Sequence, residues 1–141
     1  MMKTLGMGAS HRLNVTNINR YVRMGRIGNY ALGYKEDGIF YVCYVGRSDT
    51  DLNVRLKEHI DENSDYEYFK FKYAETVADA YMTECRNFHD FPNENNKNHP
   101  AKPEDYVGKC PVCSEWDYIT YSLLDLKVSC LDSALRNEDF Q

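Results

Sequence analysis

The stretch GNYALGYKEDGIFYVCYVGRSDTDLNVRLKEHI, residues 28–60, combines two kinds of periodicity. Its first part has two runs rich in Tyr, Val and Ile that flank Asp37 and Gly38, residue types that favour a tight turn, so a β-hairpin is predicted. After Gly46 the chain turns, and one of the polar residues 49–51 is expected to cap a helix. The apolar face of this helix is formed by Leu52, Leu56 and Ile60.

Two further elements are predicted downstream. Residues 66–73 alternate, with aromatic side chains on one side and Lys70 and Lys72 on the other, as expected for a half-buried third strand. Thr76 followed by Asp79 resembles a capping box, and it opens a second helix with an apolar stripe of Val77, Tyr81, Cys85 and Phe88. The predicted fold class is therefore α+β: a small three-stranded antiparallel sheet flanked by helices, with a zinc-knuckle-like C-terminal extension.

The remaining sequence suggests three regions. Residues 1–27 are expected to form a basic N-terminal arm and residues 28–100 the core. Residues 101–141 are expected to form a cysteine knuckle and a C-terminal extension packed on the core. An irregular Asn- and Pro-rich loop over 90–106 spans the boundary between the core and this extension. Residues 118–135 fit a strand or a helix equally well.

Charge is distributed unevenly along the chain. The net charge is −5, which alone disfavours a nucleic-acid partner because phosphate binding needs a basic surface. The first 35 residues, however, carry six basic side chains and no acidic ones, so they sum to +6 and the rest to −11. This asymmetry is typical of a basic arm on an acidic body, with a solvated tail of no special role as the alternative.

The chain is expected to be intracellular, in the cytoplasm or another reducing setting. No apolar run approaches the roughly 18 residues needed to cross a bilayer, and the N-terminus lacks the apolar core of a signal peptide. In a reducing setting cysteines serve as metal ligands, core residues or reactive thiols more often than as disulfide partners.

Glu84 falls inside the apolar stripe of the second helix. A buried carboxylate is unfavourable unless it is paired or bound to a metal, so this position indicates a functional site. The alternative is that Glu84 lies at the wet edge of a narrower stripe. Arg55 and His59 share one face of the first helix, where such a pair is either part of a site or a solvated surface.

These residues occur in an order that resembles the GIY-YIG nucleases. Gly28, Asn29 and Tyr30 resemble the first motif, with Asn29 in place of the usual aliphatic residue, and Tyr44, Val45 and Gly46 resemble the second after a slightly long interval. The rest of the signature follows in order: Arg47 and Ser48, Asp51 and Leu52, Arg55, Leu56 and His59, Glu84, then Asn96 with His99 and Pro100. The resemblance covers residues 28 to about 113.

The resemblance implies a single-metal endonuclease acting on double-stranded DNA. Glu84 would hold Mg²⁺ or Mn²⁺, Tyr30 would be the general base or orient the attacking water, and Tyr44 would position water or phosphate. Arg47 or Arg55 would lower the pKa of Tyr30, Arg55 would bind the phosphate, and His59 would relay a proton. Asn96, with Asn95 and Asn98 as alternatives, would orient the site. Neither RNA as the substrate nor any oligomeric state is excluded.

A structural zinc site is predicted from four residues. Cys85 and His89 lie four apart on the second helix, and Cys110 with Cys113 has the spacing of a zinc knuckle, which together make a Cys₃His set. His99 could replace His89. The alternative is that Cys85 is a small core residue and the other two lie in a loop, and Cys43 and Cys130 are interpreted as core.

Two alternatives to an enzyme follow from the same residues. The first is a catalytically silent, zinc-bearing nucleic-acid-binding module with the same fold. The second is a purely structural domain, which gives no reason for an acid in an apolar stripe.

Overall fold

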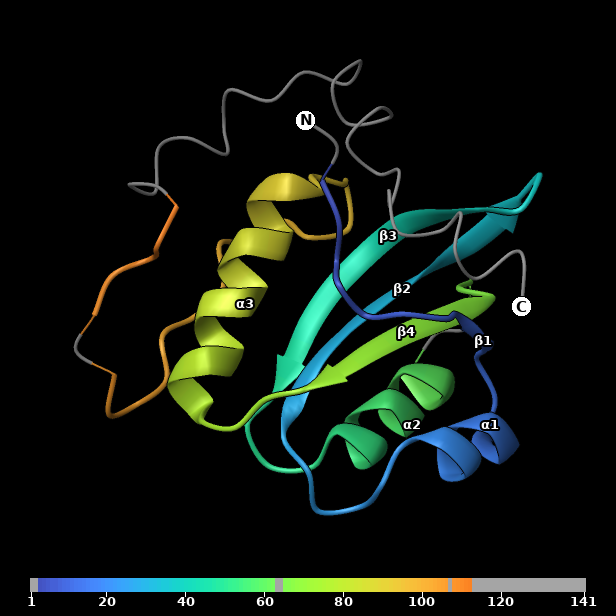
Figure 1. Ribbon diagram of the computed structural model, residues 1–141, viewed down its shortest axis with the longest axis horizontal. Coiled ribbons are helices and arrows are strands. Elements are labelled where there is room, and N and C mark those ends of the chain that lie inside the picture. The colour runs from blue at the N-terminus through green and yellow to red at the C-terminus, as the bar shows by residue number, and fades with distance from the viewer. Residues whose placement is uncertain (1–2, 63–64, 107, 113–141) are drawn as a thin grey trace.

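The structure, a computed structural model, describes residues 3–62, 65–106 and 108–112. Its antiparallel sheet has the strand order β1-β4-β2-β3, with strands β1 (His11–Arg12), β2 (Gly28–Glu36), β3 (Ile39–Ser48) and β4 (Tyr68–Tyr73). The helices are α1 (Val15–Tyr21), α2 (Leu52–Glu62) and α3 (Val77–Asp90). In Figure 1, α1 and α2 lie together at one side of the sheet, and α3 lies apart from them.

The predicted α+β class, with helices flanking an antiparallel sheet, is confirmed, but the predicted three-stranded sheet is wrong. The sheet of the described residues has four strands, because the short β1 pairs with the outer edge of β4. The charge pattern of the N-terminal sequence does not indicate a strand, and a two-residue strand has no periodicity to detect. Its pairing, His11 opposite Phe69, depends on a contact between distant parts of the chain.

The hairpin at the centre of the sheet forms where the sequence predicts it. Asp37 and Gly38 connect β2 to β3 with φ of 55° and 77°, and positive φ at both positions matches the right-handed twist of a two-residue hairpin. Asp51 begins α2 by accepting a hydrogen bond from the Val54 amide at 3.2 Å. Thr76 caps α3 in the same way, accepting from the Asp79 amide at 3.0 Å, as the capping-box spacing predicts.

Both faces of the sheet are buried, so there are two apolar clusters. Alternate residues of β2 point to opposite sides: Ala31 joins the cluster that includes Phe88 of α3, while Tyr30 and Leu32 join the cluster that includes residues of α1 and α2. Lys70 lies opposite its aromatic neighbours as predicted, but it is fully buried, with its ammonium 5.1 Å from the centroid of the Phe40 ring.

The segment predicted as a basic arm takes part in this packing. Leu5 and Met7 belong to the cluster beneath α3, and Ile18 and Val22 belong to the opposite cluster. Asn53 of α2 is buried and donates a hydrogen bond to the Val22 carbonyl at 2.8 Å. The basic side chains of this segment are therefore carried on the surface of the folded domain.

The described helices are too short or too polar to cross a membrane. The region 118–135 and the residues Cys113 and Cys130 lie outside the described residues.

Candidate active site and candidate metal cluster

Tyr30 is held on β2 by close packing against the next strand. Its side chain is 1% exposed, and its hydroxyl lies directly over Gly46 of β3. A Cβ atom at position 46 would overlap the Tyr30 hydroxyl, so glycine is required there by space. Gly28 has a similar role on the other side of β2, because a Cβ there would overlap the carbonyl of Lys72. The glycines of both motifs thus let the strands approach around Tyr30.

His59 is the hydrogen-bond partner of the Tyr30 hydroxyl. Its Nε2 lies 2.7 Å from the Tyr30 oxygen, and the imidazole is 7% exposed. Burial, with a further contribution from Arg55, lowers the pKa of His59 to about 4. At neutral pH the ring is therefore neutral, and Nε2 accepts the hydrogen bond that the Tyr30 hydroxyl donates.

The expectation that nearby arginine lowers the pKa of Tyr30 is wrong in its net direction. Burial raises the pKa of Tyr30, and the neighbouring Tyr44 adds to the rise, so the smaller opposing effect of Arg55 is outweighed. Tyr30 is thus a neutral phenol at pH 7. Tyr44 lies beside it, with ring centroids 6.3 Å apart, and 5.3 Å from His59.

Glu84 and Arg47 form a close ion pair at the wall of the site. Arg47 Nη1 donates to Glu84 Oε1 at 2.6 Å, and Arg47 also donates to Asp49 Oδ1 at 2.9 Å and to the Ala101 carbonyl at 2.7 Å. The side chain of Glu84 is 13% exposed. Burial raises the pKa of Glu84, although Arg47 partly opposes this. Arg47 therefore binds carboxylates. Arg55 is the arginine that lies near Tyr30 and Tyr44.

Asn96 lies on the edge of the sheet. Its side-chain amide donates to the Val45 carbonyl at 2.9 Å and accepts from the Val45 amide at 2.8 Å, so it pairs with β3 as another strand would. Asn95 donates to the Cys43 carbonyl at 2.9 Å. Both contacts fix the loop after α3 to the edge strand next to Tyr44, which fits a positioning role for Asn96.

Five of the residues predicted for catalysis line one cleft of about 230 Å³: Tyr30, Tyr44, Arg47, Arg55 and Glu84. His59 lies behind Tyr30, and Asn96 lies on the backbone of β3. Gly46, Asp49 and Ala101 complete the lining. The structure thus brings together residues from β2, β3, α2 and α3 that are separated by up to 54 positions in the sequence.

Sequence reasoning missed three contributors to this region. The sequence predicts Asp49 only as a possible helix cap, yet it binds Arg47 and lines the cleft. Ala101 acts through its carbonyl, which no side-chain pattern reveals. Asn29 is buried, and its side chain donates to the Ala80 carbonyl at 2.8 Å, which ties β2 to α3.

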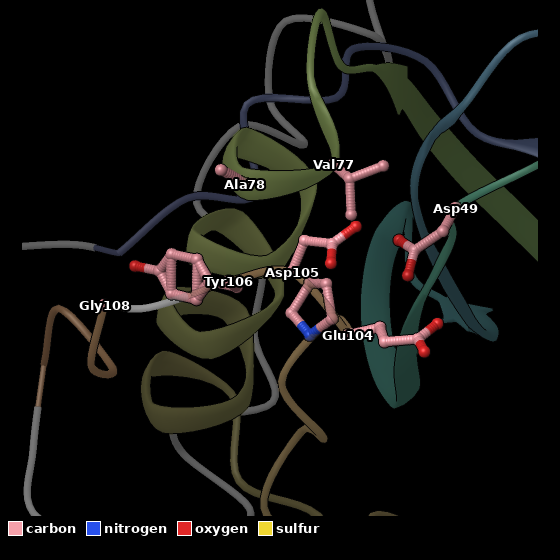
Figure 2. Close-up of a pocket in the computed structure, with 8 residues that line it drawn as sticks. Asp49, Val77, Ala78, Glu104, Asp105, Tyr106 and Gly108 are labelled. Carbon is pink, nitrogen blue, oxygen red and sulfur yellow. The ribbon is translucent and has the colours of Figure 1, made fainter.

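A larger hollow of about 630 Å³ adjoins the cleft and shares Asp49 with it. Figure 2 shows the carboxylates of Asp49, Glu104 and Asp105 around this hollow, with Val77 and Tyr106 at its sides. The clustered negative charge opposes the entry of phosphate. Nucleic acid is therefore not expected to occupy this side of the cleft.

A separate Cys/His cluster forms where the chain after α3 returns to that helix. Cys85, His99 and Cys110 bring one ligand atom each within 4.8 Å of one another, a set that could hold a metal ion such as zinc. His99 takes the place predicted for His89, which is 2% exposed on α3 with its ring centroid 5.3 Å from that of His99. The i, i+4 spacing placed His89 near Cys85, but it did not reveal the returning loop.

Comparisons of the chain with family models, with curated proteins and with solved structures give no match.

Proposed function

We propose that this chain is a metal-dependent endonuclease that hydrolyses phosphodiester bonds in DNA. The observation that carries the proposal is the cleft lined by Tyr30, Tyr44, Arg47, Arg55 and Glu84, with His59 bonded to the buried Tyr30 hydroxyl. Phosphodiester hydrolysis requires an activated water, positive charge at the phosphoryl group and a cation near the developing negative charge. These residue types supply a group for each task.

Water activation is assigned to Tyr30 acting together with His59. The Tyr30 hydroxyl donates to neutral His59 Nε2 at 2.7 Å, so its oxygen lone pairs can accept a proton from water as its own proton passes to His59. The hydroxide equivalent then attacks phosphorus, and the phosphorus–oxygen bond to the leaving oxygen breaks. The leaving oxygen takes a proton from solvent water, and His59 returns its extra proton to solvent. This relay does not require an ionised tyrosine, which agrees with the raised pKa of Tyr30.

Phosphate binding is assigned to Arg55. Its guanidinium is about one-third exposed and lines the cleft, while its contacts with Glu58 at 3.2 Å and Glu62 at 3.7 Å are on the solvent side. Surface ion pairs of this kind contribute little, so they are readily exchanged for a phosphate. Arg47 instead orients Glu84.

The cleft's own charges argue for a bound cation. Arg47 and Arg55 balance Asp49 and Glu84, so a phosphodiester would introduce an uncompensated negative charge. Glu84 fits as the ligand of Mg²⁺ or Mn²⁺, because its carboxylate is at the cleft wall. Burial raises the pKa of Glu84 because it destabilises the carboxylate, and a nearby cation would stabilise that charge. When bound, such an ion supplies Lewis-acid stabilisation of the phosphate oxygens. A structural zinc ion at the Cys/His cluster would be a second ion, separate from this one.

The test is a cleavage assay of the full chain on supercoiled plasmid, single-stranded DNA, branched DNA and RNA, with Mg²⁺, Mn²⁺ or EDTA. Glu84→Gln should abolish metal-dependent cleavage of DNA, because the amide cannot replace an anionic ligand. Asp79→Asn, an exposed acid on the same helix, should cut like the wild type. Wild-type cleavage by Glu84→Gln would overturn the assignment.

The same assay separates the enzyme from a silent binding module. A module would retain DNA without cutting any substrate in any metal, and Glu84→Gln would leave its affinity unchanged. That result would replace the proposed nuclease with the zinc-bearing binding function.

A further inference from the structure

We infer that Cys85, His99 and Cys110 bind a zinc ion that fastens the 92–110 loop to α3 and thereby holds the loop's contacts with the catalytic cleft. Cys85 comes from the helix, and the two other ligands come from the returning loop. The metal site does not depend on the proposed nuclease function, since zinc binding is measured without any cleavage.

The donor atoms and their spacing suit zinc. The three ligand atoms lie within 4.8 Å of one another, while Zn–S of about 2.3 Å and Zn–N of about 2.0–2.1 Å place tetrahedral ligands roughly 3.5–3.8 Å apart. Closure thus needs ligand shifts on the order of 1 Å or less. Two thiolates and an imidazole are the soft and borderline donors that zinc prefers over Mg²⁺.

Neighbouring hydrogen bonds orient two of the ligands. His99 Nδ1 lies 3.1 Å from the Pro100 carbonyl, and a carbonyl only accepts, so Nδ1 carries the proton and Nε2 carries the lone pair that would bind a metal. Zinc-binding histidines commonly donate their second ring nitrogen to a carbonyl in this way. The Val112 amide donates to Cys110 Sγ at 3.4 Å, which orients this ligand.

The 92–110 loop makes hydrogen bonds to β3 and to Arg47. Asn95 and Asn96 bind the backbone of Cys43 and Val45, and Ala101 accepts from Arg47 Nη2 at 2.7 Å. His99 lies between Asn96 and Ala101, so an ion bound there fixes the loop between its two points of attachment. His99 is in this sense a positioning residue for Arg47 and the edge of β3.

The first test measures metal in the full chain, purified with a non-thiol reductant and no chelator. We expect about one equivalent of zinc by elemental analysis, and Co²⁺ substitution should give sulfur-to-metal charge-transfer bands. Cys110→Ser and His99→Ala should each lose most of the zinc. Cys43→Ser, a matched change on β3 outside the cluster, should keep the zinc. His89→Gln should also keep the zinc, because His99 is the histidine ligand in this proposal.

The second test measures hydrogen exchange of the Val45 amide, which donates to Asn96 on the outer edge of β3. Removing zinc with a chelator should speed exchange at Val45 by ten-fold or more, while amides of the central strand β2 stay protected. Adding Zn²⁺ back should restore the protection.

Retention of a full equivalent of zinc in both Cys110→Ser and His99→Ala would overturn the site, as would a protein that binds no zinc at micromolar free Zn²⁺. Unchanged exchange at Val45 in metal-free protein that is still folded would overturn the coupling to the cleft. Both readouts differ from cleavage, so a protein that binds zinc but cuts no nucleic acid would contradict the nuclease proposal alone.

Discussion

Glu84 and Cys85 are neighbours on α3, yet they face two different regions. Glu84 points to the cleft, where its carboxylate is paired with Arg47, and Cys85 points to the returning loop, beside His99 and Cys110. Consecutive residues of a helix are rotated by about 100°, which is enough to separate a hard oxygen donor from a soft sulfur donor. In the proposed function, one helix would therefore serve two sites with different metal preferences.

The two regions differ in how they are held. The cleft is organised by the fold itself: Tyr30 packs over Gly46 and bonds to His59, and Arg47 joins three oxygen acceptors. The cluster depends on a loop without regular structure, which brings its three ligand atoms within 4.8 Å of one another. We therefore expect the cleft to be preorganised and the cluster to be completed by its metal.

The largest expected effect distinguishes the chemistry of the cleft from its scaffold. Tyr30→Phe keeps the ring and removes the hydroxyl that bonds to His59, so we predict a fall in cleavage rate of roughly 10²–10⁴. Zinc content should not change, because the cluster is separate. Single-turnover cleavage of plasmid measures the rate, with Tyr34→Phe at the turn end of β2 as the control. A variant that loses activity and zinc together would break the proposed separation of the two regions.

The cleft was easier to predict from the sequence than the cluster. The cleft residues occupy ordered elements, so the hairpin turn at Asp37 and Gly38 and the cap at Thr76 were predictable from local rules, as was Glu84 from helical spacing. These rules operate over a few residues.

The features that were missed depend on contacts between distant segments. The pairing of β1 with β4 and the burial of Lys70 beside Phe40 follow from how both faces of the sheet are covered. The sequence left both His89 and His99 open as the zinc ligand, and the choice of His99 depends on where an irregular loop returns, about which helical spacing contains no information. The rise in the pKa of Tyr30 was missed for a similar reason, because the burial that causes it is a property of the whole fold.

A smaller effect tests the neutral state of His59. Its folded-state pKa of about 4 lies below the unfolded value of 6.5, so protonation favours unfolding. Stability from neutral His59 is complete above pH 6.5 and is lost as the pH falls toward 4. Between pH 7 and about pH 4.5, the wild type should lose about 2.5 kcal/mol more unfolding free energy than His59→Gln, measured by urea denaturation. Equal losses in both proteins would show that His59 is not held neutral.

Close packing in the cleft is tested by a double-mutant cycle. Gly46→Ala should destabilise the wild type by about 1–3 kcal/mol, because the new methyl group overlaps the Tyr30 ring and hydroxyl. In a Tyr30→Leu background the same change should cost about 1 kcal/mol less, since the obstructing atoms are gone. Urea denaturation of the four proteins measures the coupling. Strict additivity would mean that position 46 does not position Tyr30.

The smallest expected effect concerns the basic N-terminal segment. Spacing alone would align Arg20, Arg23 and Arg26 along one helical edge, but α1 ends at Tyr21, so the last two arginines lie in the connection to β2. Arg20 and Arg26 stack on aromatic rings, 5.6 Å from Tyr21 and 4.2 Å from Tyr73, and all three are exposed. They are therefore not a continuous ridge, although each remains available to a phosphate.

Replacing all three arginines with Gln should make the dependence of DNA affinity on salt shallower. Each lost phosphate contact reduces the log–log slope by roughly 0.9, so we expect a change of about 1–3 units with kcat within a few-fold of wild type. The Glu84→Gln protein is the background for binding, because it leaves the DNA uncut. Lys35→Gln, near the hairpin turn, removes one charge far from this segment and should leave the slope unchanged. If the triple variant also keeps its slope, these arginines form a solvated surface, and the phosphate contacts belong to Arg55 and to the exposed Lys72 of β4 instead.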